Sequence, residues 1–498
     1  MAQRAVSVIA ALFVAGLVVG PVAAVLWRGG GFTALSTADL DALQFTVWQA
    51  FWSAAISVGL AVPVARALAR RQFWGRGALI SIMGAPFILP VVVAVLGLIS
   101  VFGGRGFLNA VLGPLGLPRL DVYGAHGVIL AHVFFNLPLA VRLILQGWLA
   151  IPSERFQVAA SLGAPVFWLL EWPMLKRIVP GAFAVIFVIC LGSFAVALTL
   201  GGGPRATTVE LAIYQAFKFD FDLSKAASLA VVQLALGLGA GLVALFLARG
   251  DMLGAGLDRV VRRWDGSRVM DAMWIGAAAL FLLAPLCALV IAGVPGLGDL
   301  PGSIWAATGR SVAISLGAVV LTMMLALPLA TRAGEAASLL GISVSGLVLG
   351  TGLFILLQPY VRPSSVALPV TLLVNVLMSL PFVLRILRTG VEGAKADYGR
   401  LGASLGLRGW ALWRIAYLPR LRRPMGFSAG LTAALAMGDL GVITLFSRPG
   451  QGTLPLAMYE LMGRYQMGAA YAAALVLVAV SLALFWVFDR GGRVNADV

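Results

Sequence analysis

Few residues of this chain have types and spacings suited to chemistry, and one acidic side chain stands apart from the rest. Of the 20 acidic residues, only Asp439 lies inside a long apolar run. If that run crosses a membrane, an ionisable group there costs at least about 2.5–3.5 kcal/mol and usually faces a cavity or a partner. Asp439, together with Asn136 in the other half of the chain, is therefore a candidate pathway or gate residue. A structural hydrogen bond within a helix bundle is the alternative.

Patterns for catalysis and metal binding are missing from the sequence. None of the four lysines belongs to a GxxxxGK[ST] phosphate-binding loop, so any ATP must be bound by a separate chain. His126 and His132 are six residues apart, on different faces of a helix, and Cys190 and Cys287 lie in separate apolar runs. We therefore predict that this chain has no catalytic residue, binds no metal and holds no cofactor of its own.

The strongest signal is a polar loop that occurs twice, at 151–178 and 388–424. In each loop a helix-forming stretch ends at Ala-Ser-Leu-Gly, and a second amphipathic stretch follows. The glycine allows a turn that a side chain would obstruct, and the short side chains beside it leave a surface that another protein can approach. A helix lying on the membrane surface is the alternative, but the repetition favours a pair of docking sites. The candidate contact residues are Gln157, Ala159, Gly163, Arg400, Gly402 and Gly406.

The composition indicates which elements must position these loops. The chain has 498 residues, 61% of them hydrophobic and 11% charged, with a mean hydropathy of +0.99. Soluble proteins carry about 25% charged residues, so soluble globular proteins and disordered chains are both excluded. Continuous apolar runs predict an all-α polytopic membrane protein with twelve transmembrane helices. The predicted spans lie near 6–26, 45–65, 78–102, 127–150, 179–200, 227–248, 272–293, 311–330, 336–358, 366–387, 425–447 and 469–488.

The formal charge of +16 serves as a topology signal, since loops rich in lysine and arginine stay in the cytoplasm. With the N-terminus inside, 26 of the 36 basic residues fall on cytoplasmic segments. Both termini are therefore predicted to be cytoplasmic, and the basic charge gives no reason to expect nucleic-acid binding. Segments 201–225 and 448–468 are then periplasmic.

The two loops belong to an internal duplication. Pro138, Arg142 and Gly163 recur 243 residues later as Pro381, Arg385 and Gly406, and the shift becomes 245–246 further along. Six spans in each repeat give two halves that enter the membrane the same way round. We predict a first half at 1–250, a cytoplasmic linker at 251–270 and a second half at 271–498.

The loops resemble the EAA loop of binding-protein-dependent ABC importer permeases. That motif is Glu-Ala-Ala, three residues, Gly, nine residues and Ile-x-Leu-Pro. Gly406 and Pro419 keep this spacing, whereas Gly163 and Pro173 are three residues closer, and Gln157 and Arg400 stand in place of the leading Glu. The resemblance implies the type I importer permease fold, with two parallel six-helix repeats in a single fused chain.

A longer resemblance narrows the family. Residues 201–222, Leu170–Pro173, Tyr398–Leu401 and Gly438–Gly441 look like the permease of the thiamine ABC transporter. This implies a multi-pass protein of the bacterial inner membrane that passes thiamine, or its phosphates, from a periplasmic binding protein to the cytoplasm. It also implies two copies of a cytoplasmic ATPase, which uses the ATP, and segments 201–225 and 448–468 as candidates for docking the binding protein.

Other functions fit parts of the pattern. Permeases for ferric iron or polyamines share the EAA loop. An ion-gradient-driven secondary carrier accounts for twelve spans and cytoplasmic termini, but not for the paired glycine-bearing loops. A membrane scaffold without transport activity is a more distant reading.

Overall fold

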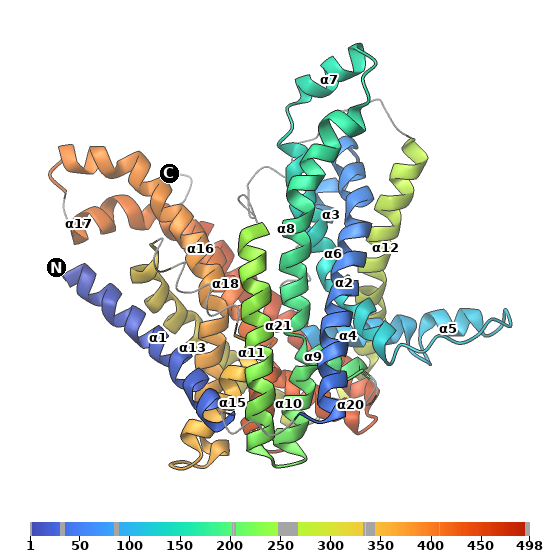
Figure 1. The fold of residues 1–498 in the computed structure, drawn as a ribbon, viewed down its shortest axis with the longest axis vertical. Coiled ribbons are helices and arrows are strands. Elements are labelled where there is room, and N and C mark those ends of the chain that lie inside the picture. The colour runs from blue at the N-terminus through green and yellow to red at the C-terminus, as the bar shows by residue number, and fades with distance from the viewer. Residues whose placement is uncertain are drawn as a thin grey trace.

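The computed structural model describes residues 2–29, 35–83, 89–201, 203, 206–247, 267–331, 334, 344–407 and 409–493. Within these ranges the secondary structure is helical, and no strand occurs (Figure 1). This confirms the predicted all-α membrane fold, in which each long apolar segment satisfies its backbone hydrogen bonds internally.

The helices form two series in the same order. The first series comprises α1 (Ala2–Gly29), α2 (Thr37–Arg70), α3 (Arg76–Ile82), α4 (Val91–Phe102), α5 (Phe107–Leu112), α6 (Ala125–Leu149), α7 (Ser153–Ser161), η2 (Phe167–Glu171), α8 (Trp172–Leu191), α9 (Phe194–Leu200), α10 (Val209–Lys218) and α11 (Leu223–Leu247). The second comprises α12 (Arg268–Gly293), η4 (Val294–Asp299), α13 (Gly302–Leu329), α15 (Gly346–Leu357), η5 (Pro363–Ser365), α16 (Ala367–Ser404), α17 (Trp410–Leu412), η6 (Trp413–Tyr417), α18 (Leu418–Met437), α19 (Gly441–Phe446), α20 (Leu454–Gly463) and α21 (Met467–Arg493).

Eleven helical segments among the described residues are long and apolar enough to cross a membrane. They match eleven of the twelve predicted spans, including the first apolar run at Ser7–Arg28. The ninth predicted span, 336–358, is represented by the twelve-residue α15, and residues 335–343 lie outside the described part. Most of the predicted linker, 251–266, also lies outside it, and α12 begins at Arg268.

The span predicted at 78–102 is shorter than predicted, since α3 ends at Ile82 and α4 starts at Val91. Two other predicted spans are broken near a glycine. The span predicted at 179–200 ends as α8 at Leu191, and α9 starts at Phe194. The span predicted at 425–447 ends as α18 at Met437, and α19 starts at Gly441. Glycine occupies the first position of each break, Gly192 and Gly438. Hydropathy averaged over a window does not detect such a break, because the residues on both sides remain apolar.

The two halves interlock through their first helices. α1 packs against α15 of the second half, and α12 packs against α4 and α2 of the first half. The hydroxyl of Ser7 on α1 donates to the carbonyl of Pro328 on α13 at 2.8 Å. Each half therefore holds the opening helix of the other.

The connecting helices gather at opposite ends of the bundle. Helices α7 and α17 lie toward the upper end of Figure 1, on the side of the C-terminus, whereas α10 and α20 lie at the lower end. This arrangement is compatible with the orientation predicted from the basic residues.

Candidate functional site

The two glycine-bearing loops fold into hairpins with the same cap. We call them the first hairpin (Ser153–Glu171) and the second hairpin (the end of α16 to Tyr417). Gly163 and Gly406 adopt φ of +60° and +68°, a left-handed conformation that favours glycine. The amide of Ala164 donates to the Ala159 carbonyl, and that of Leu407 to the Gly402 carbonyl, both at 2.9 Å. These bonds satisfy helix-end carbonyls in the Schellman manner, so the predicted turn is confirmed in both hairpins.

The return arm of each hairpin contains one π-helical segment directly before its proline. Phe167–Glu171 precedes Pro173, and Trp413–Tyr417 precedes Pro419. Proline removes an amide donor and its ring clashes with the carbonyl of residue i−4. A π-turn widens the helix at that point. The first hairpin is three residues shorter than the second between its capping glycine and its proline. Both π segments have five residues, so the difference lies in the turn and at the start of the return helix.

Ala159 and Gly402 are predicted contact residues, but the structure buries them inside the hairpins. Ala159 is only 7% exposed. A methyl group added to Gly402 would overlap the Leu412 side chain on the return arm. Both positions are buried within their hairpins, and their role in ATPase contact stays a prediction.

The outer face of each hairpin exposes apolar side chains instead. Leu162 is 75% exposed and Leu405 66%, and each directly precedes the capping glycine. Val158 and Leu401 are also exposed, one turn earlier. The remaining predicted contact residues are exposed as well; they are Gln157, Gly163, Arg400 and Gly406. Apolar side chains outside the spans that stay exposed in matching positions are typical of a surface covered by another protein.

A second pair of matching features lies at the breaks of the two spans. In the first half, Nε2 of His132 lies 2.5 Å from Oγ of Ser193, inside the break. In the second half, Nδ2 of Asn375 donates to a carboxylate oxygen of Asp439 at 3.5 Å. His132 and Asn375 are 243 residues apart, which is the shift that relates the hairpins. Asp439 therefore lies between two helices rather than within one, and its other oxygen accepts from the Gly441 amide at 3.1 Å.

A buried carboxylate that the sequence did not single out lies beside the first break. Glu210, at the start of α10, is 2% exposed, and Nε2 of Gln233 donates to it at 3.3 Å. Burial raises the pKa of Glu210 to about 7, and hydrogen bonds from Ser345 and Gln233 oppose that rise. Because Ser345 begins α15, this contact joins the two halves. The sequence placed Glu210 in the segment 201–225, which is predicted to be periplasmic, and gave no sign that it is buried.

The two breaks approach each other where the halves meet. The carboxylate of Glu210 lies next to Gly192, and the ring of Phe194 lies next to Gly441. α10 contacts both α9 and α19. Polar groups from both halves, including Glu210 and Asp439, thus border one region of the interface.

Comparison with known proteins decides the family, although no protein-family model matches the chain. The thiamine transport system permease protein ThiP of Salmonella typhimurium is 40% identical over 495 residues, covering 93% of this chain and 92% of the relative. ThiP of Haemophilus influenzae is 32% identical over 89% of this chain and 87% of the relative. The sulfate permease CysW of Synechococcus elongatus is 27% identical over only 38% of this chain. The chain belongs to the thiamine transport permease family.

In this thiamine permease, the two predicted pathway residues, Asn136 and Asp439, lie in different surroundings. Asn136 is 3% exposed and donates to the His132 carbonyl and, at 3.4 Å, to Sγ of Cys190. It therefore links α6 to the end of α8, and its role as a pathway or gate residue stays a prediction. Asp439 is partly accessible at the interface between halves.

Proposed function

We propose that this chain is the permease of an ATP-driven importer that carries thiamine across the bacterial inner membrane. The observation that carries the proposal is the pair of identically capped hairpins with exposed apolar tips, in a chain similar over nine-tenths of its length to thiamine permeases. A secondary carrier has no ATPase to dock, so it does not require two such hairpins. The permease contributes no ATPase chemistry, which belongs to a separate partner.

Two ATPase subunits would dock on the two hairpins, through Gln157, Leu162 and Gly163 in the first and through Arg400, Leu405 and Gly406 in the second. Closing the ATPase dimer would draw the hairpins together and open the interface between halves toward the periplasm. This is a rigid-body rotation about an interface. A periplasmic binding protein would deliver the substrate at α10 and α20.

Reconstitution tests the substrate. The permease, its ATPase and its binding protein are placed in vesicles, and ATP hydrolysis is measured with the binding protein loaded or empty. Thiamine-loaded binding protein is expected to stimulate hydrolysis. Stimulation by ferric ion or a polyamine, with none by thiamine, would retain the importer class and refute the substrate. Transport without any ATPase would favour the secondary carrier.

We propose that Asp439 attracts the cationic substrate at the interface between halves. Asp439→Asn keeps the side-chain size and can still accept from the Gly441 amide, but it removes the negative charge. We expect thiamine uptake in the reconstituted system to fall about tenfold, equivalent to ~1.4 kcal/mol, while basal ATP hydrolysis persists. Unchanged uptake by this variant would leave Asp439 as a purely structural group.

The proposed orientation makes a separate prediction. A cysteine at Asp220, beyond the end of α10, is expected to react with a membrane-impermeant maleimide added to intact spheroplasts. A cysteine at Ser161 in the first hairpin is expected to react only after permeabilisation. Both positions are exposed, and both variants are made without Cys190 and Cys287. The opposite labelling pattern would refute the proposed orientation in the membrane.

A further inference from the structure

The two hairpins are joined to their spans in different ways. In the second half, α16 runs from the span into the hairpin, so Ala367–Ser404 is one helix. In the first half, α6 ends at Leu149 and α7 begins at Ser153, directly after Pro152. Helices usually end before a proline, because its ring disfavours the helical conformation of the preceding residue. Movement of the second hairpin can therefore reach its span along a continuous helix, whereas the first hairpin lacks this connection.

A buried carboxylate joins the first hairpin to two spans instead. Glu171, the last residue of the π segment in the return arm, is fully buried. One of its oxygens lies 2.8 Å from Nη2 of Arg66 on α2. The other accepts from the indole Nε1 of Trp148, at the end of α6, at 3.3 Å. We call Arg66, Trp148 and Glu171 the clamp, because together they connect the return arm to α2 and to α6 across the break at Pro152.

The internal repeat relates each residue of the clamp to an uncharged residue of the second half. Leu-Ala-x-Pro ends at Pro63 in α2 and at Pro328 in α13, and this shift of 265 relates the two helices. With it, and with the shifts of 243 and 246 further along, the equivalents of the clamp residues are Thr331, Val391 and Tyr417. The last two pack in one apolar cluster. The ion pair thus belongs to the half whose hairpin is separated from its span.

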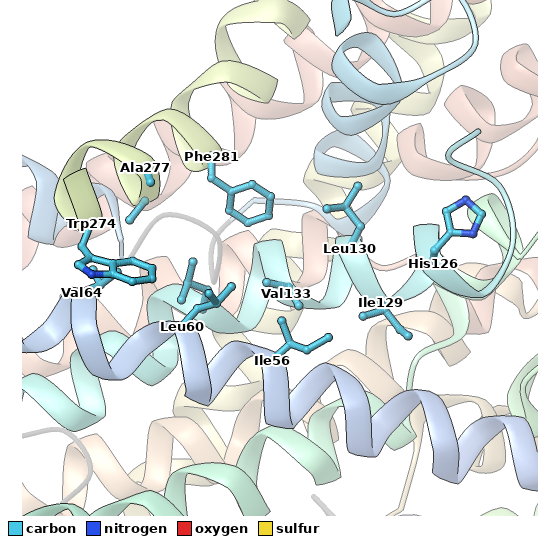
Figure 2. Close-up of a pocket in the computed structure, with 12 residues that line it drawn as sticks. Ile56, Leu60, Val64, His126, Ile129, Leu130, Val133, Trp274, Ala277 and Phe281 are labelled. Carbon is cyan, nitrogen blue, oxygen red and sulfur yellow. The ribbon is translucent and has the colours of Figure 1, made fainter. Parts of the chain in front are cut away.

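The spans that the clamp joins are packed on the interface between the halves. α2 packs on α6, and both line an apolar groove together with α12, the first helix of the second half (Figure 2). The lining includes Leu60 and Val64 from α2, Val133 from α6, and Trp274 and Phe281 from α12. α2 also contacts α12 directly. A displacement of α2 and α6 can therefore reach the second half through packed side chains.

We propose that Glu171 is a positioning residue that transmits movement of the first hairpin to the spans. Closure of the ATPase dimer would pull on the hairpin, and the return arm would move α2 and α6 with it through the clamp. In the second half, the continuous α16 would transmit the movement without an ion pair. This inference rests on the proposed docking of ATPase subunits on the two hairpins.

Distances between spin labels test this role in the permease assembled with its ATPase and binding protein in nanodiscs. One pair of labelled cysteines replaces Glu154 and Asp397, which are exposed at equivalent positions of the two hairpins. A second pair replaces Asp220 and Gln466, which are exposed beyond α10 and α20 at the opposite end of the bundle. Both distances are measured without nucleotide and with a non-hydrolysable ATP analogue, in a background without the native cysteines.

Glu171→Gln keeps the size of the side chain and the acceptor for Trp148, but removes the charge that pairs with Arg66. We expect the hairpins of this variant to close as in the unmodified protein, whereas the distance change at the opposite end falls by at least half. Thiamine carried per ATP hydrolysed is expected to fall at least about fivefold, the lower end of typical coupling between two sites. A merely structural role would lower both distance changes together with the yield of folded complex.

Matched variants complete the test. Arg66→Met removes the other charge, on a side chain that is 33% exposed, and is expected to reproduce the loss even if Glu171→Gln does not fold. The double variant should lose no more than either single variant, because both act on one ion pair. Glu171→Asp keeps the charge and should recover part of the coupling, and Tyr417→Phe, at the equivalent position of the second hairpin, should keep both distance changes.

Two results would contradict the inference while leaving ATPase docking intact. One is a full distance change at the opposite end in either folded single variant, and the other is additive losses in the double variant. Failure of the hairpins to close in the unmodified complex would instead refute the docking of ATPase subunits on them, and the role of Glu171 with it.

Discussion

Gly406→Val is expected to reduce substrate-stimulated ATP hydrolysis by the assembled importer at least tenfold. Gly406 has φ of +68°, and a β-branched residue in this conformation is strained by about 1–3 kcal/mol, so the cap would rearrange. Leu405, which precedes it on the exposed tip, would then move away from the ATPase. Folding should survive, because a Cβ at this position meets no other atom within 4 Å. Reconstituted ATPase assays with loaded binding protein measure the effect.

Two further variants distinguish the effect of the cap conformation from the effect of the added side-chain volume. Asparagine tolerates the left-handed conformation, so Gly406→Asn is expected to keep at least half of the coupling. Gly163→Val is expected to be milder than Gly406→Val, because only the second hairpin keeps the spacing of the permease motif. Normal coupling in Gly406→Val would refute the role of this cap. Equal losses in the two valine variants would refute the ranking of the hairpins.

The duplicated loops could be predicted from sequence because their signal is local. A glycine after Ala-Ser-Leu is required by the backbone conformation itself, so residue type reports the turn at Gly163 and Gly406 directly. The eleven long spans were predictable for a similar reason, since each depends only on its own continuous hydrophobicity. The ATPase-contact and pathway roles of the candidate residues remain predictions.

The features that could not be predicted from the sequence depend on which segments pack against each other in the folded chain. Small residues were expected to form a surface at Ala159 and Gly402, but both are buried, and Leu412 of the return arm lies against Gly402. Exposed leucines, Leu162 and Leu405, form the outer face instead. Asp439 looked like an acid inside a helix because apolar residues flank the break on both sides. Glu210 lies in a segment expected outside the membrane, and only tertiary packing buries it.

Asp271→Asn is expected to lower the free energy of unfolding by about 3–5 kcal/mol, the usual cost of removing one partner of a buried ion pair. Asp271, the first residue of the predicted second half, is 2% exposed and binds two arginines of α2. Nε of Arg70 donates to it at 2.8 Å and Nε of Arg71 at 2.6 Å. Without the carboxylate, the buried guanidinium of Arg70 loses its counter-ion. Denaturant titration of the purified permease measures the loss.

A matched surface variant and a double variant complete this test. Asp397→Asn removes a partner from the exposed pair with Arg420, whose atoms are 3.9 Å apart, and is expected to cost about 0–1 kcal/mol. Arg70→Met combined with Asp271→Leu replaces the buried pair with apolar side chains and should recover most of the stability, since Arg71 is accessible enough to reach water. Because Asp271 belongs to the first helix of the second half, this ion pair joins α12 to the first half independently of the chain linker. A loss in Asp271→Asn no larger than in Asp397→Asn would show that packing of α12 on α2 and α4 is sufficient to hold the halves together.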